Sequence, residues 1–94
     1  MTPKAQKLLE RMRQSKSDWK RKDLDQLYKG FGFVIIHGGS HDIVKHPDFP
    51  NLRAILPRHS YLAKGYVEYA IKIIDKLSEL RKDISNENNA SRKG

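Results

Sequence analysis

The sequence of 94 residues contains no cysteine, only one tryptophan and no long apolar run. The lack of cysteine excludes a disulfide framework and a thiolate metal site, and it fits a reducing compartment. No stretch reaches the ~18 apolar residues of a transmembrane helix. The first residues also lack the apolar segment of a secretory signal. We therefore expect a cytoplasmic protein with no membrane association.

Acidic residues are scarce relative to basic ones. Nineteen lysines and arginines stand against eleven aspartates and glutamates, which gives a formal net charge of +8. A domain this basic attracts polyanions, and nucleic acid is the first candidate. An acidic protein partner would satisfy the same charge. The length suits one small domain with a packed core, but no large buried substrate cavity.

Residues 1–16 are expected to form an accessory helix. Pro3 occupies a typical first helical position. Apolar residues follow it at helical spacing, namely Ala5, Leu8, Leu9 and Met12. Such a stripe suits docking onto the rest of the domain, and a contact with a partner or a second copy is the alternative.

A second helix is expected over residues 18–29. Ser17 is a suitable N-cap, and Gly30 is a suitable terminator. Trp19 is expected to be a core or docking residue rather than a platform for base stacking. A last helix is expected from Tyr66 to about Arg81, because an amphipathic stripe runs along it, formed by Val67, Ala70, Ile71, Ile74 and Leu77.

Two strands are expected in the stretch FGFVIIHGGSHDIVKH, over residues 33–36 and 41–45, with a turn at 38–40. If the turn has three residues, His37 and His41 lie opposite each other. The apolar residues then divide into Ile35 and Ile43 on one face and Val34, Ile36 and Val44 on the other. Because both faces are apolar, the pattern leaves open which of them meets the helices.

A third strand is expected over residues 52–56, ended by Pro57 because proline cannot donate to a ladder. The polar residues 83–94 cannot bury enough surface to become ordered, so we expect a disordered tail. The fold class is then α+β, with a three-stranded antiparallel sheet and helices packed on one face. The domain proper, residues 17–82, has the α-β-β-β-α order of double-stranded-RNA-binding domains.

RNA cleavage is the first chemistry to consider for a basic protein of this kind. The substrate supplies its own nucleophile, the 2′-hydroxyl, so the protein must move protons and stabilise a charged phosphorane. Histidine suits the proton transfers because its pKa of ~6.5 lies near neutrality. Lysine and arginine can stabilise the charge. This chemistry requires no metal and no other cofactor.

Among the four histidines, His41 has the best setting for this role, since it follows two glycines that let a phosphate backbone approach closely. Lys45 is expected on the same strand face. Arg58 and His59 follow the third strand and can close a pocket, although for His59 a structural role stays open. A zinc site is disfavoured, because cysteine and a recognised ligand spacing are missing. A structural role is expected for the remaining histidines, His37 and His46.

Between Trp19 and Leu80, short motifs occur in a specific order: Gly32-Phe33, Gly39-Ser40-His41 with Ile43, His46-Pro47, Leu56-Pro57-Arg58-His59 and Lys64-Gly65. In this order and spacing the chain resembles the HicA family of toxins. These are ribosome-independent mRNA interferases of bacterial toxin–antitoxin pairs.

The resemblance implies a fold like that of a double-stranded-RNA-binding domain. It also implies that His41 is the catalytic histidine and that Gly39, next to Ser40, shapes the adjacent backbone. A cognate HicB-like antitoxin would cover the active site. The N-terminal helix and the polar tail depart from the compact family pattern.

The leading hypothesis is therefore a toxin that cleaves mRNA as an endoribonuclease. His41 acts as general acid or base, and His59 is the candidate second proton carrier. Lys45, Arg58 and Lys64 bind RNA phosphates. The expected partners are mRNA and the antitoxin, and the free protein is expected to be a monomer. The alternatives are a non-catalytic RNA-binding module, which reads shape and phosphates, and a protein-interaction domain whose charge serves an acidic partner.

Overall fold

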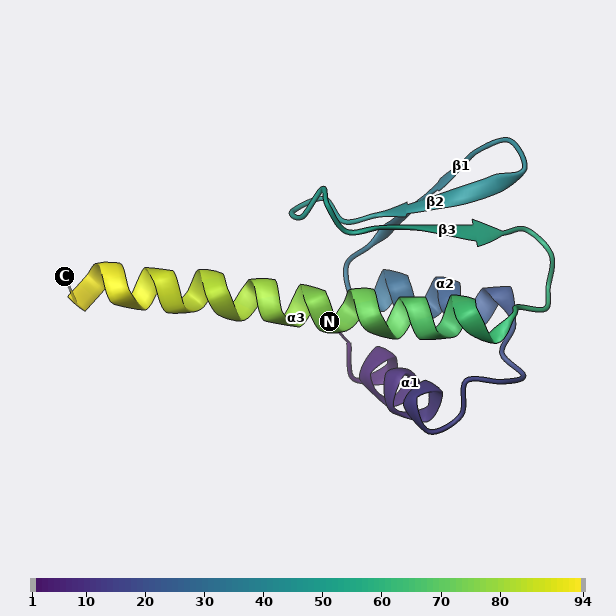
Figure 1. Ribbon diagram of the computed structural model, residues 1–94, viewed down its shortest axis with the longest axis horizontal. Helices are drawn as coiled ribbons and strands as arrows, with labels where there is room; N and C mark the ends of the chain where they lie inside the picture. Colours follow the sequence, from purple (N-terminus) through teal and green to yellow (C-terminus); the bar gives the residue numbers. More distant parts are fainter. Residues whose placement is uncertain (1, 94) are drawn as a thin grey trace.

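The computed structural model describes the backbone of residues 2–93 and the side chains of residues 2–83. Within these limits the chain forms, in order, α1 (Pro3–Gln14), α2 (Arg21–Gly30), β1 (Val34–His37), β2 (His41–Lys45), β3 (Arg53–Pro57) and α3 (Lys64–Lys93). The sheet is antiparallel in the order β1-β2-β3. Helices α2 and α3 cover one of its faces, and α1 lies on their far side (Figure 1). The expected α+β class is confirmed.

Helix α1 docks onto the domain, as its apolar stripe predicts. Thr2 is its N-cap, and the Thr2 hydroxyl accepts a hydrogen bond from the Ala5 N–H at 3.1 Å. Leu9 and Met12 are buried in the core together with Ala5. Gly30 of α2 packs so closely here that a Cβ on it would overlap the Cβ of Ala5. The small side chains therefore set the close approach of α1 and α2.

The predicted start of the second helix is wrong. Helix α2 begins at Arg21, and its N-cap is Lys20 rather than Ser17. Asp18 has a φ of 67°, a left-handed conformation that cannot continue a right-handed helix. Lys20 is held extended by a β-bridge to Tyr61. A tertiary contact therefore delays the helix beyond the point that its sequence favours.

The pairing expected for a three-residue turn is not the one that the hairpin has. His37 pairs with Asp42 and not with His41. Because side chains alternate along a strand, a shift of one residue changes which residues share a face. Ile35 therefore lies beside Val44, on the side that meets the helices.

The other side of the sheet is covered by none of the described helices (Figure 1). We call it the open face. Its side chains comprise Val34, Ile36, His41, Ile43, Lys45, Arg53, Ile55 and Pro57, and all but the buried Pro57 are exposed or half-buried. Strand β3 includes Pro57, which was expected to follow it. Pro57 is tolerated because β3 is an edge strand and needs no donor on its outer side.

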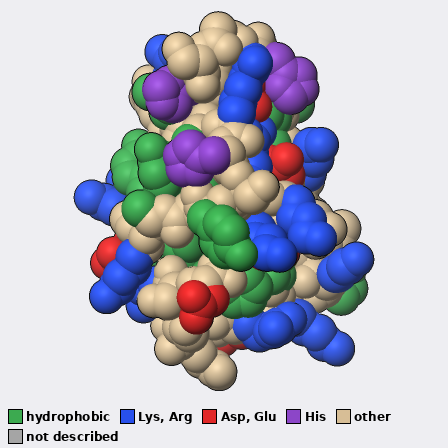
Figure 2. Space-filling model, turned by 90° about the vertical axis from the view of Figure 1, so that its right-hand side faces the viewer, with side chains coloured by type: hydrophobic (Ala, Val, Ile, Leu, Met, Phe, Trp, Pro, Cys, Tyr) green, Lys and Arg blue, Asp and Glu red, His purple; other side chains and the backbone are tan. Residues whose placement is uncertain are grey.

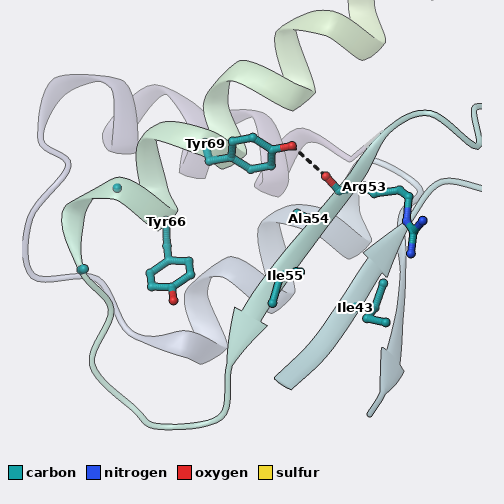
Figure 3. A pocket seen from close by; sticks show the side chains of 8 residues that line it. Ile43, Arg53, Ala54, Ile55, Tyr66 and Tyr69 are labelled. Atoms are coloured by element: carbon teal, nitrogen blue, oxygen red, sulfur yellow. Dashed lines mark hydrogen bonds between the residues drawn. The ribbon is translucent and has the colours of Figure 1, made fainter. Parts of the chain in front are cut away.

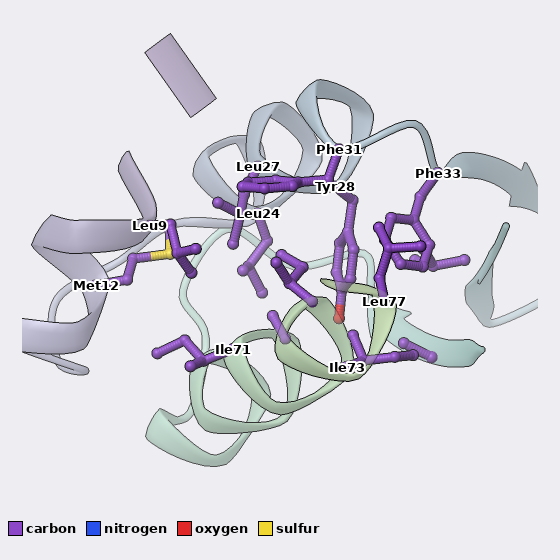
Figure 4. Packing of buried hydrophobic residues seen from close by; sticks show 14 of the residues in the cluster. Leu9, Met12, Leu24, Leu27, Tyr28, Phe31, Phe33, Ile71, Ile73 and Leu77 are labelled. Atoms are coloured by element: carbon purple, nitrogen blue, oxygen red, sulfur yellow. The ribbon is translucent and has the colours of Figure 1, made fainter. Parts of the chain in front are cut away.

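The core lies between the sheet and the helices. Figure 4 shows side chains of all three helices converging with Phe33, which precedes β1, in one cluster. Trp19 packs at its margin, half-buried, and its indole N–H donates to the Ser15 carbonyl at 2.7 Å. The stripe predicted for the last helix is buried throughout, at Val67, Ala70, Ile71, Ile74 and Leu77.

Helix α3 is longer than expected. It begins at Lys64 and its backbone continues to Lys93, past the predicted end near Arg81. The predicted disordered tail, 83–94, falls almost wholly outside the residues whose side chains are described, so it stays a prediction. No helix in the described part of the chain has the length and apolar character needed to cross a membrane.

Candidate functional site

His41 is the first residue of β2 and is exposed on the open face. Its neighbour on β3 is Pro57. Its imidazole makes no hydrogen bond or ion pair with any described residue. Both ring nitrogens are therefore available to a bound molecule. Figure 2 views this end of the molecule, where histidine side chains lie among lysine and arginine side chains.

The turn before His41 has a steric requirement for glycine at one position. A Cβ on Gly38 would lie 2.6 Å from the His41 carbonyl oxygen, whereas a Cβ on Gly39 would meet nothing within 4 Å. Neither glycine has a positive φ, so close approach and not backbone conformation sets the requirement. The sequence indicated Gly39 and Ser40 as the residues that shape the turn, whereas the position that requires glycine is the preceding one, Gly38.

A buried carboxylate lies directly behind the turn. Asp42 is 2% exposed, and its Oδ2 accepts a hydrogen bond from Arg21 Nη2 at 2.7 Å. Its Oδ1 lies 3.2 Å from Arg58 Nε and 3.2 Å from His37 Nδ1. The hydrogen bond from Arg21, with smaller contributions from His37 and Arg58, lowers the pKa of Asp42 well below its ordinary range, against the opposing effect of burial. We call these four residues the Asp42 cluster.

The Asp42 cluster fixes the hairpin to the rest of the fold. Arg21 also donates from Nη1 to the Pro57 carbonyl at 2.8 Å, and so joins α2 to β2 and β3. Arg58 donates from Nη2 to the Gly38 carbonyl. Arg58 was predicted to bind phosphate, and the structure gives its guanidinium a second task, holding the turn next to His41. The sequence did not predict this cluster. The one indication of it was an acidic residue, Asp42, within a partly apolar strand.

The other predicted residues come from three parts of the fold: strand β2, the loop after β3 and the start of α3. Lys45 shares the open face with His41, as expected. Four steps along the strand put their Cα atoms ~13 Å apart, so the two side chains meet an RNA strand at different points. Arg53 lies directly beside Lys45 on β3. Lys64 begins α3 and is exposed. His59 is exposed, and its Nδ1 lies 2.7 Å from the Tyr61 carbonyl oxygen within its own loop, which leaves Nε2 free of described contacts.

His46 is a structural residue, as expected. It is buried, with its ring edge-on to Phe33 at 4.9 Å between centroids. Its Nδ1 accepts a hydrogen bond from the Asp48 N–H at 3.1 Å, and its Nε2 faces Arg81 Nη2 at 3.4 Å. Burial first, and the Arg81 charge second, lower the pKa of His46. The neutral imidazole therefore belongs to the core.

No protein-family model, curated protein or solved structure matches this chain. Function must therefore be argued from the residues and their geometry. Among the described residues, no group of three or more His, Asp and Glu side chains is placed to hold a metal ion.

Proposed function

We propose that this protein is an endoribonuclease that cleaves mRNA without a metal or cofactor, as the toxin of a HicA-type toxin–antitoxin pair. The observation that carries the proposal is the exposed imidazole of His41, which has no described partner and directly precedes Asp42, the carboxylate that binds Arg21 and Arg58. The order α2-β1-β2-β3-α3 supports a fold like that of double-stranded-RNA-binding domains. The motif resemblance around Gly39-Ser40-His41 supports the family assignment.

In the proposed reaction, His41 takes the proton of a 2′-hydroxyl, and the resulting oxyanion attacks the adjacent phosphorus. The bond from phosphorus to the 5′-oxygen breaks, and that oxygen receives a proton. The products are a 2′,3′-cyclic phosphate and a 5′-hydroxyl end. His59 is the candidate proton donor through its Nε2. One positioned acid or base contributes typically ~10²–10⁴-fold in rate.

The cations have separate tasks in this proposal. Arg58 holds the turn that carries His41, through its bonds to the Gly38 carbonyl and to Asp42. Lys45 binds a phosphate farther along the RNA, because ~13 Å of strand separates it from His41. Lys64 binds another flanking phosphate. An acidic, HicB-like antitoxin would inhibit the enzyme by covering the open face.

The test combines an RNA digest with a growth assay. Wild-type protein, incubated with single-stranded mRNA and excess chelator, is expected to give fragments that end in cyclic phosphate. His41→Ala is expected to abolish both the fragments and growth arrest while keeping the fold, because the side chain is exposed. Fragments and arrest with His41→Ala would refute the assignment. Intact RNA bound by the wild type would favour the non-catalytic module instead.

A further inference from the structure

A groove lies between β3 and the first turns of α3, next to the open face (Figure 3). Its volume is about 530 Å³. Tyr66 and Tyr69 line it from α3, and Ile43, Arg53 and Ile55 line it from the sheet. Ile55 and Tyr69 are 60% and 49% exposed. The groove therefore presents aromatic and aliphatic surface to solvent, with a cationic side chain among its lining residues.

Two of the backbone groups that face this groove are already hydrogen-bonded. Strand β3 is an edge strand, and alternate residues turn their N–H and C=O groups outward. The Tyr69 hydroxyl donates to the Arg53 carbonyl at 2.9 Å, which identifies the outward set as Arg53, Ile55 and Pro57. Pro57 has no N–H, and its carbonyl accepts from Arg21 at 2.8 Å. Ile55 in the middle keeps the one complete donor–acceptor pair at this edge of the described chain.

We propose that the groove is a subsite for one nucleobase of single-stranded RNA. Tyrosine rings give a base of any kind a flat apolar surface for stacking. The N–H and C=O of Ile55 can meet the hydrogen-bonding edge of that base. Arg53 adds positive charge for the phosphate of the same nucleotide. The inference rests on the proposed function for the identity of the substrate, and it adds where a nucleotide near the cleaved bond binds.

The position of the groove fits a nucleotide close to His41. Ile43 lines the groove and follows His41 by two residues on the same face of β2. Residues two apart on a strand are ~7 Å apart, which is the scale of one nucleotide step in an extended RNA strand. A base in the groove therefore places a neighbouring phosphate within reach of the imidazole.

The same edge suits a protein strand less well. An added β-strand needs N–H and C=O groups repeated at every second edge residue. Here the Arg53 carbonyl and the Pro57 carbonyl are already bonded, and the Pro57 N–H does not exist. A planar base needs only the pair at Ile55. The net charge of +8 also complements the phosphates that accompany a base.

The test is a binding measurement that does not depend on cleavage. The probe is a short single-stranded RNA in which every 2′-hydroxyl is methylated, so that the attacking group is blocked. One nucleotide at a time is made abasic. For the wild-type protein, one abasic position is expected to weaken binding roughly 5- to 150-fold, the range for loss of one stacked base. The other abasic positions are expected to change affinity much less.

Substitutions in the groove identify where that base binds. Tyr66→Ala and Ile55→Ala are expected to weaken binding of the intact probe and to remove its sensitivity to the abasic position. Tyr66→Phe keeps the ring and is expected to behave like the wild type. Ile36→Ala is the matched control for Ile55→Ala, because both isoleucines flank Ile43 on the open face and Ile36 lies outside the groove.

Failure of this inference is distinct from failure of the proposed function. The subsite is overturned if no abasic position weakens binding more than the others. It is also overturned if one position does so equally in the wild type, in Tyr66→Ala and in Ile55→Ala. If Tyr66→Ala and Ile55→Ala bind RNA like the wild type but no longer bind an acidic protein that the wild type binds, the subsite is also overturned and the groove is assigned to a protein partner. If unmodified RNA is not cleaved but the abasic pattern and its dependence on the groove hold, the subsite stands and the nuclease assignment fails.

Discussion

Gly38→Ala is a direct perturbation of the turn that presents His41. The added Cβ would lie 2.6 Å from the His41 carbonyl oxygen, closer than real Cβ atoms come to such an atom. That oxygen belongs to the backbone, so it cannot rotate away. The turn must open, which moves the Gly38 carbonyl relative to Arg58 and displaces the start of β2.

The magnitude follows from the cost of overpacking. An extra methyl without space costs typically ~1–3 kcal/mol, and for a domain of this size each kcal/mol lowers Tm by about 4–8 °C. Displacement of a reacting group by ~1 Å can cost ~10²-fold in rate. We therefore expect Gly38→Ala to lower both Tm and the rate of RNA cleavage.

Gly39→Ala is the matched control, since it adds the same methyl one residue later. Nothing lies within 4 Å of that position, and the φ of Gly39 is not positive. We expect its stability to be unchanged or higher by ~0.4–1 kcal/mol, because alanine restricts the unfolded chain. Thermal unfolding, followed by cleavage assays well below both Tm values, compares the two variants. Equal Tm values and equal rates for them would refute the steric argument.

Two further predictions concern the buried titratable groups. The lowered pKa of His46 means that its contribution to stability is present above its ordinary pKa of ~6.5 and is lost as the pH falls below that value. Denaturant unfolding at pH 7.5 and 5.5 should show this loss of stability in the wild type and much less of it in His46→Phe. An equal loss in both proteins would assign the pH dependence to other groups. The lowered pKa of Asp42 means that its contribution is present above ~3.9 and is lost on further acidification. Asp42→Asn leaves Arg58 without a carboxylate and Arg21 with Asp25 alone, so we expect a lower Tm and slower cleavage at neutral pH with His41 still in place. Wild-type values for both would show that the Asp42 cluster does not hold the turn.

The local pattern was sufficient to predict strand β2 and the face shared by His41 and Lys45. Both follow from alternation within one strand, which does not depend on its pairing. The pairing itself was missed, because a glycine-rich turn permits more than one length. With His37 opposite Asp42, four residues, 38–41, lie between the paired residues instead of three. Arg58 holds this turn through the Gly38 carbonyl, a contact between residues 20 apart in the chain. Such a contact leaves no signal in the hairpin sequence.

The start of α2 was missed for a similar reason. Ser17 has the right chemistry for an N-cap, but the chain is extended as far as Lys20 by its bridge to Tyr61. The Arg21 N–H also donates to the Ser60 carbonyl at 2.8 Å. These contacts come from the loop before α3 and override a local preference of ~1 kcal/mol.

The central claim is that the His41 imidazole transfers a proton during RNA cleavage. The most direct measurement is the single-turnover rate of RNA cleavage in excess chelator, for wild-type protein and for His41→Ala. Thermal unfolding first checks that the two proteins have the same Tm. The account predicts a rate at least ~10²-fold lower for His41→Ala. Equal rates, or a wild-type activity that the chelator abolishes, would contradict it.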